Sequence, residues 1–320
     1  MLNLHGTSIL LAVGIALFSL RTGMTAESVP APTIVEPTLT LVVQANKTTY
    51  VQFEPVYLTC TLKNASWQAI AADISTLGLD GDRLTVYVQD AAGSRSQYYS
   101  GPIVDRLGTA IRDFAPAGMP GDRMVGFVSI FFNDVTGRLA FPVSGRYDIE
   151  TKVFLGSLPE AKYAVGETLQ IEVVEPSGVD RQLIESVGGE DRLIQLLKRS
   201  AVKYCDEKAQ ESCYAKLRGL VSRYSDSNYS PAIAFGLARA VGAGVVRGAP
   251  RPDLEAEILK EFLSQWSQHP LAPEVMRFLI LALHKGGRDR EASELVRRFE
   301  ADYPGRESPR RWIKAAAEAD

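Results

Sequence analysis

Polar and apolar residues alternate along the first half of the chain, between residues 38 and 175. Turn-forming Gly, Pro, Asn and Asp residues divide this stretch into six or seven short segments. Because successive side chains of a strand point to opposite faces, an alternation of period two predicts strands with one buried face. We therefore expect residues 38–175 to form a sandwich of two antiparallel sheets. The alternating positions are Leu39, Leu41 and Val43; Val56, Leu58, Cys60 and Leu62; Leu84, Val86 and Val88; Val128, Ile130 and Phe132; Tyr147, Ile149 and Thr151; and Leu169, Ile171 and Val173.

The spacing of apolar residues changes to steps of three and four after residues 176–180, which contain a Pro and a Gly and serve as the predicted linker. The pattern is strongest from Pro273 to Arg306, where a Gly286–Gly287 break separates two helical segments and Pro304 follows the second. One helical hairpin cannot bury its own apolar face. We therefore expect residues 181–320 to form an array of stacked hairpins. The apolar positions of this hairpin are Val275, Met276, Leu279 and Leu283, then Ala292, Leu295, Val296 and Phe299.

An aromatic residue closes three helical segments of similar sequence: Leu220–Tyr224, Phe262–Trp266 and Leu295–Phe299. A polar turn follows each of them, and then a Pro that can occupy the first position of a new helix. This recurrence favours hairpins joined by loops of variable length.

The Pro273–Arg306 hairpin resembles a tetratricopeptide repeat, whose unit has about 34 residues. The matching residues are Leu279, Gly287, Ala292 and Pro304. In that family, partners lie along the surface formed by the first helix of each unit. The resemblance implies a peptide- or protein-binding surface made by Glu274, Arg277, Leu281 and His284 of this unit and by Phe235 and Arg239 of the preceding one. The competing interpretation is that these are solvated or packing residues of a compact bundle.

The segment Tyr50–Asn64 resembles the entry of immunoglobulin-like domains that are common in secreted bacterial proteins. Pro142–Tyr147 resembles the turn before their penultimate strand, with Tyr147 as a candidate corner tyrosine. The two resemblances imply a multi-domain β plus α protein, in which an immunoglobulin-like antiparallel β-sandwich precedes an α-helical, tetratricopeptide-like array. The connection from Ala91 to Pro120 is long for a loop and carries aromatic residues, so it is a second candidate for binding.

Residues 1–26 have the features of a secretory signal peptide, because an apolar run too short to span a bilayer precedes small residues. The alternatives are an uncleaved anchor and a buried terminal helix. Residues 27–37 are rich in Pro and Val and predict an extended lead-in. The sequence thus predicts a periplasmic or secreted bacterial protein with no membrane span after signal removal.

The three cysteines lie at positions 60, 205 and 213. On one straight helix Cys205 and Cys213 would be about 12 Å apart, which is too far for a disulfide. A polar stretch separates them, and if it forms a helix–helix turn the two sulfurs can meet. Since an oxidising compartment favours the bond, we expect a Cys205–Cys213 disulfide and a free Cys60 in the sandwich core.

The formal net charge is −3, and neither half of the chain concentrates basic residues as nucleic-acid binding requires. Only three histidines are present, and no HExxH, Walker or GxSxG motif occurs. We therefore expect no catalytic residue, no metal site and no cofactor. The sequence favours an extracytoplasmic protein-interaction or assembly module that binds a protein or peptide through its helical repeats. The alternatives are a hydrolase with its site between the two domains, and a carbohydrate- or protein-binding sandwich with the helices as a spacer. The sequence leaves the oligomeric state open.

Overall fold

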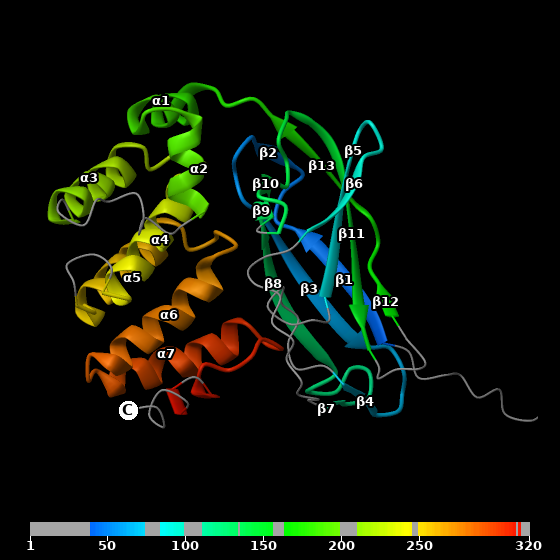
Figure 1. Cartoon of the computed structure of the whole chain (residues 1–320). Helices are drawn as coiled ribbons and strands as arrows, with labels where there is room; N and C mark the ends of the chain where they lie inside the picture. The colour runs from blue at the N-terminus through cyan, green and yellow to red at the C-terminus, as the bar shows by residue number, and fades with distance from the viewer. Residues whose placement is uncertain are drawn as a thin grey trace, which may run out of the picture. The chain divides into compact units, whose positions relative to one another are not determined.

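The structure is a computed structural model of the chain, and it describes residues 39–73, 84–98, 111–133, 135–155, 163–198, 210–244, 249–311 and 313–314. The predicted signal peptide and the whole of the predicted lead-in lie outside the described residues. Within the compact unit Pro37–Asp320, strands occupy the part before residue 175 and helices the part after it, as Figure 1 shows. The change coincides with the predicted linker at 176–180. That the two parts are separate domains stays a prediction.

The strands form two main sheets, which confirms the predicted antiparallel β architecture in its coarse form. One sheet has the order β1-β3-β8, and the other has the order β2-β13-β11-β5-β6, with β12 paired to β11. The β4–β7 and β9–β10 pairs are small, and among the described ladders only β13–β2 is parallel. The strands are β1 (Leu39–Ala45), β2 (Thr49–Val51), β3 (Val56–Asn64), β4 (Ile70–Asp73), β5 (Leu84–Asp90), β6 (Arg95–Tyr98), β7 (Ile111–Phe114), β8 (Arg123–Ile130), β9 (Phe132–Asn133), β10 (Arg138–Leu139), β11 (Gly145–Phe154), β12 (Tyr163–Val165) and β13 (Leu169–Val174).

The apolar residues of the alternating pattern meet between the two sheets. In the β1–β3 ladder Leu41 lies opposite Leu62 and Val43 opposite Cys60, and all four side chains are buried. Cys60 is free, as expected. The connection that we expected to be a long loop over residues 91–120 instead contains β6 and β7. The side chains of Tyr98 at the end of β6 and Phe114 at the end of β7 are buried in the core of the strand part.

The helices follow the three- and four-residue spacing of apolar side chains. Proline stands at the start of α4, α5 and α6, where the missing N–H costs no hydrogen bond. Gly287 has a φ of 71° and ends α6 in the left-handed conformation that glycine adopts without strain. The helices are α1 (Gly178–Val187), α2 (Glu190–Lys198), α3 (Gln210–Arg223), α4 (Ser230–Gly242), α5 (Pro252–Gln265), α6 (Ala272–Lys285) and α7 (Asp289–Asp302).

Consecutive helices from α3 to α7 pack against one another and share one core. The predicted hairpin is present as α6 and α7, on either side of the Gly286–Gly287 break. Among the described helices, none combines the length and the apolar character that crossing a membrane requires.

Strand β3 contributes to two cores through its two faces. Leu58 and Cys60 point into the sandwich, whereas Tyr57 belongs to the core formed by the helices. The Tyr57 ring stacks on Phe127 of β8 at 5.6 Å and meets the edge of His269 at 5.3 Å. The outer face of the β1-β3-β8 sheet therefore packs on the helical part.

Candidate functional site

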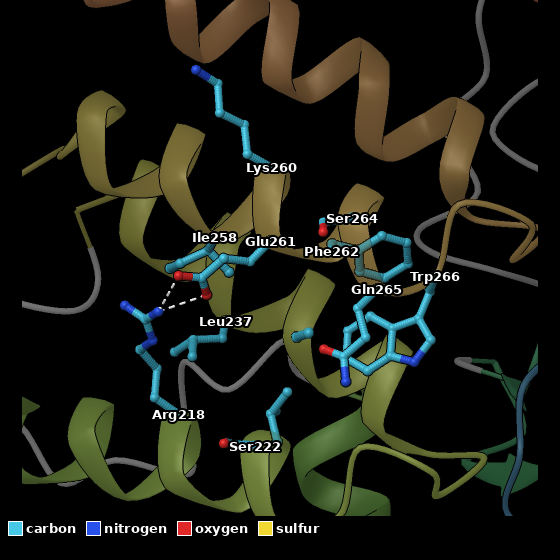
Figure 2. A pocket seen from close by; sticks show the side chains of 12 residues that line it. Arg218, Ser222, Leu237, Ile258, Lys260, Glu261, Phe262, Ser264, Gln265 and Trp266 are labelled. Atoms are coloured by element: carbon cyan, nitrogen blue, oxygen red, sulfur yellow. Dashed lines mark hydrogen bonds and ion pairs between the residues drawn. The ribbon is translucent and has the colours of Figure 1, made fainter.

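A groove with a volume of about 590 Å³ opens between α3, α4 and α5. Figure 2 shows Arg218 and Glu261 pointing toward each other from α3 and α5, with Gln265 and Trp266 further along the chain at the end of α5. Three helices thus surround one opening. The lining residues are Arg218, Val221, Ser222, Ala234, Leu237, Ile258, Lys260, Glu261, Phe262, Ser264, Gln265 and Trp266.

The floor of the groove is apolar. Leu237 and Phe262 belong to the buried helical core, and they form the floor because α4 and α5 each keep an apolar face toward their neighbours. Ala234 also lines the groove, and its small side chain fills little of the space between the helices. Trp266 is half-buried, with its ring 5.1 Å from that of Phe262 in an edge-on arrangement. Among the apolar side chains of the lining, Val221 and Trp266 are the half-buried ones that a ligand could contact.

Charged side chains on the rim are paired with each other. Nη2 of Arg218 donates to Oε2 of Glu261 at 2.6 Å, and Nη1 donates to the Tyr214 hydroxyl at 3.2 Å. The hydrogen bond with Tyr214 is the main reason that the pKa of Arg218 is raised, so Arg218 stays positively charged. Lys260 forms an ion pair with Glu291 of α7, and the Lys260 hydrogen bond lowers the pKa of Glu291. The rim therefore carries little net charge.

Neutral polar side chains complete the rim. Ser222, Ser264 and Gln265 are exposed, and within the described part of the chain their side chains have no intramolecular hydrogen-bond partner. Hydroxyl and amide groups both donate and accept hydrogen bonds. An apolar floor bordered by such groups matches the general anatomy of ligand sites.

The surface predicted from the tetratricopeptide resemblance is a different one. Phe235 of α4 packs its ring on Phe278 of α6 at 5.6 Å, and the Arg239 guanidinium lies 3.7 Å from the centre of the same ring. Arg239 also pairs with the buried Glu255, whose pKa is raised by burial despite that pairing. These two predicted residues thus hold α4, α5 and α6 together.

The predicted residues of α6 also have internal partners. Glu274 accepts two hydrogen bonds from Arg277 at 2.9 and 3.0 Å and lies 3.5 Å from Arg306. Nδ1 of His284 lies 2.6 Å from Oδ1 of Asp289, and Leu281 is half-buried. The structure brings together Phe235 with Arg239, and Glu274 with Arg277. None of the six predicted residues lines the groove between α3 and α5. A role for them in binding stays a prediction.

Sequence reasoning missed the groove because its residues come from three helices whose packing is not visible in a local pattern. One feature of the sequence does point to this region. The Phe262–Trp266 segment ends its helix with an aromatic residue, and Trp266 now lies at the edge of the opening.

Cys213 is disulfide-bonded. Its predicted partner Cys205 lies outside the described residues, so the pairing stays a prediction. Among the described residues, no group of three His, Cys, Asp or Glu side chains is arranged to hold a metal ion.

No protein-family model and no curated protein matches the sequence. Comparison with solved structures finds a β-glucosidase from Erythrobacter marinus, with 14% identity, a TM-score of 0.24, and coverage of 43% of this chain and 16% of the glucosidase. It also finds the sporulation control protein Spo0M from Bacillus subtilis, with 12% identity, a TM-score of 0.24, and coverage of 47% of this chain and 54% of Spo0M. A third match is Salmonella alpha-2-macroglobulin, with 13% identity, a TM-score of 0.22, and coverage of 85% of this chain and 23% of that protein.

Proposed function

We propose that this protein is an extracytoplasmic interaction module that holds a peptide segment of a partner protein in the groove between α3, α4 and α5. The observation that carries the proposal is the groove itself, which has an apolar floor and a rim of neutral polar groups without a hydrogen-bond partner among the described residues. Its volume of about 590 Å³ lies within the range of about 300–1,000 Å³ that is usual for ligand sites.

The charged and polar groups of the rim determine which kind of peptide the groove can bind. Its charged groups are already satisfied by Arg218–Glu261 and Lys260–Glu291 pairs, so a charged peptide would have to displace an existing ion pair. A segment with one or two large apolar side chains and little net charge needs no such displacement. Its apolar side chain would contact Val221 and Trp266, while Gln265 and the serines would hydrogen-bond its backbone.

The finer architecture is also part of the proposal. An immunoglobulin-like sandwich is supported by Tyr147, whose hydroxyl donates to the Val143 carbonyl at 2.8 Å in the manner of a corner tyrosine. A tetratricopeptide-like array is supported by the α6–α7 hairpin and its glycine break. Location outside the cytoplasm is supported by the apolar N-terminal sequence and by the disulfide-bonded Cys213, because disulfides persist in oxidising compartments.

The test selects peptides from a displayed random library with the full chain and then measures the affinity of the synthetic winners. Ser222→Trp places a large ring at an exposed position of the groove, and it should weaken binding by about tenfold or more. Lys216→Trp is the matched control, because Lys216 is exposed on the same helix and does not line the groove.

Winning peptides that share large apolar residues and bind the Lys216→Trp variant normally are the expected result. Peptides that bind the folded Ser222→Trp variant as tightly as the wild type would place the interaction elsewhere.

A further inference from the structure

A second cavity, of about 450 Å³, lies at one end of the β-sandwich, away from the helical groove. Strands β5, β6 and β11 form one wall, and the segment that carries the β9–β10 pair forms the other. The lining residues are Val88, Asp90, Ser94, Ser96, Tyr98, Asn133, Thr136, Arg138, Leu139, Ala140, Pro142 and Tyr147.

The cavity begins where the inner face of the sandwich changes from apolar to polar. In the β5–β6 ladder, the buried Val86 lies opposite the buried Tyr98, and the buried Val88 lies opposite Ser96. Since side chains two residues apart share a face, Ser96 and Asp90 occupy inward positions. Yet Ser96 is exposed and Asp90 is only half-buried. Polar residues at positions where a core would ordinarily have apolar ones concentrate at functional sites.

Some polar groups of the lining are used by the fold. Oδ1 of Asp90 accepts the backbone N–H groups of Ala92 at 3.0 Å and Ser94 at 2.8 Å, which fixes the carboxylate in place. The Asn133 amide donates to the Gln97 carbonyl at 2.8 Å, and its oxygen accepts two backbone N–H groups at 3.1 Å. These contacts fix the positions of the Asp90 and Asn133 side chains in the wall.

Other polar groups of the lining have no partner within the protein. Among the described residues, no hydrogen bond or ion pair engages the hydroxyls of Ser94, Ser96 and Thr136 or the guanidinium of Arg138. Asp90 is the only carboxylate in this lining and Arg138 the only cation, so the formal charges cancel. Leu139, Ala140 and Pro142 add an apolar patch to the same cavity.

We propose that this cavity binds a neutral saccharide. Sugar hydroxyl groups are donors and acceptors at once, which matches a lining of three hydroxyls, one oriented carboxylate and one guanidinium. The C–H face of a sugar ring would rest on the patch around Ala140 and Pro142. The volume lies inside the range of about 300–1,000 Å³ that is usual for small-molecule sites.

The experiment measures binding of maltose, cellobiose and N,N′-diacetylchitobiose to the full chain by saturation-transfer NMR. Ser96→Leu fills the cavity from an inward position, and Arg138→Ala removes an exposed donor. Each should weaken binding by about tenfold or more. Gln97→Leu is the matched control, since its side chain lies on the opposite face of the same strand. Ser222→Trp in the helical groove should leave saccharide binding unchanged.

Saturation transfer from at least one disaccharide, lost in Ser96→Leu and Arg138→Ala and kept in Gln97→Leu, is the expected outcome. Two results would overturn the proposal: no disaccharide gives a signal at millimolar concentration, or Ser96→Leu and Gln97→Leu bind equally well.

Discussion

At the scale of single residues, Phe53 has an unusual backbone conformation. Its φ is 70°, in the left-handed region that residues other than glycine rarely enter. The turn is closed by a hydrogen bond from the Glu54 N–H to the Val51 carbonyl at 2.9 Å. The Phe53 ring is buried in the core that the helices form, and Tyr229 of that core donates to the neighbouring Gln52 carbonyl at 2.6 Å. Burial of the ring thus holds a strained turn in place.

At position 53 we expect the glycine variant to be more stable than the alanine variant. Phe53→Ala loses the buried ring and keeps the strain, so it should cost about 3–5 kcal/mol of unfolding free energy. Phe53→Gly loses the same ring and relieves the strain, so it should be the more stable variant by about 1 kcal/mol. Urea unfolding measures both values. A glycine variant that is less stable than the alanine variant, as in ordinary strands and helices, would contradict this account.

We expect protonation of His269 to lower the stability of the folded state at acidic pH. Burial, and secondarily the charge of Lys47, lowers its pKa to about 4. Its Nδ1 accepts the Leu271 N–H at 3.2 Å, and its ring meets Tyr57 and Phe262 edge-on. The folded state therefore holds a neutral imidazole.

The sign of the pH effect follows from that lowered pKa. Unfolded histidine titrates near pH 6.5, so the contribution of His269 is complete above that pH and is lost as the pH falls toward 4. The loss amounts to about 3 kcal/mol. Burial raises the pKa of nearby Glu54, so that carboxyl acts in the opposite direction. His269→Gln should reduce the loss of stability between pH 7 and pH 4, measured by urea unfolding at each pH. An unchanged pH profile in this variant would exclude His269 as the titrating group.

At the scale of elements, the turn after α7 lies directly on the edge strand β8. The Val125 N–H donates to the Gly305 carbonyl at 2.9 Å. Gly305 has a φ of 87°, and a Cβ atom there would lie 3.0 Å from Cγ of Arg123 and 3.1 Å from Cγ2 of Val125. The backbone conformation therefore favours glycine, and the side chains of β8 leave little room for a Cβ atom.

Gly287 provides a matched comparison for Gly305. It also has a positive φ, of 71°, but a Cβ atom there would meet nothing within 4 Å. Gly287→Ala should therefore cost only the backbone strain, about 1 kcal/mol. Gly305→Ala should cost distinctly more, because the turn must also move away from β8. Thermal unfolding of the two variants measures the difference. Equal losses of stability in the two variants would show that the turn can move away from β8 at no cost in free energy.

At the scale of the whole molecule, a polar network joins the β-strand part to the helices. Lys47 pairs with the buried Glu54 at 2.8 Å and donates to Oδ1 of Asn228 at 3.0 Å. Asn228 and Ser227 in turn donate to the buried carboxylate of Asp180 at the start of α1, at 2.7–2.9 Å. Each buried carboxylate is satisfied within its own part of the chain, and the hydrogen bond from Lys47 to Asn228 joins the two, beside the aromatic contact of Tyr57 with His269.

This junction should make the strands and helices unfold together. We expect a single calorimetric transition for the wild type. Lys47→Met leaves the buried Glu54 without its cation and should cost about 3–5 kcal/mol. Lys216→Met, an exposed position of α3, is the control and should change stability by less than about 0.5 kcal/mol. Two resolved transitions in the wild type would show that the parts fold independently.

The sequence by itself determined that a part made of strands precedes a part made of helices, because each follows from a period that is local to the chain. Alternation of Leu39, Leu41 and Val43 suffices to predict β1, and the Gly286–Gly287 break suffices to divide α6 from α7. Such signals depend on neighbours within a few residues. They say nothing about which faces meet across long separations.

The positions of the two candidate binding sites depend on the tertiary structure alone. Packing directs Tyr57 into the helical core and leaves the groove beside Trp266. It also brings Arg239, which the tetratricopeptide resemblance implied for a binding surface, against Phe278. Ser96 falls in the 91–120 stretch that the sequence predicted as a loop, and its register against Val88 places it on the inner face of a strand. Cavities are the spaces that helices and sheets leave when they pack, and packing is set by residues distant in the sequence.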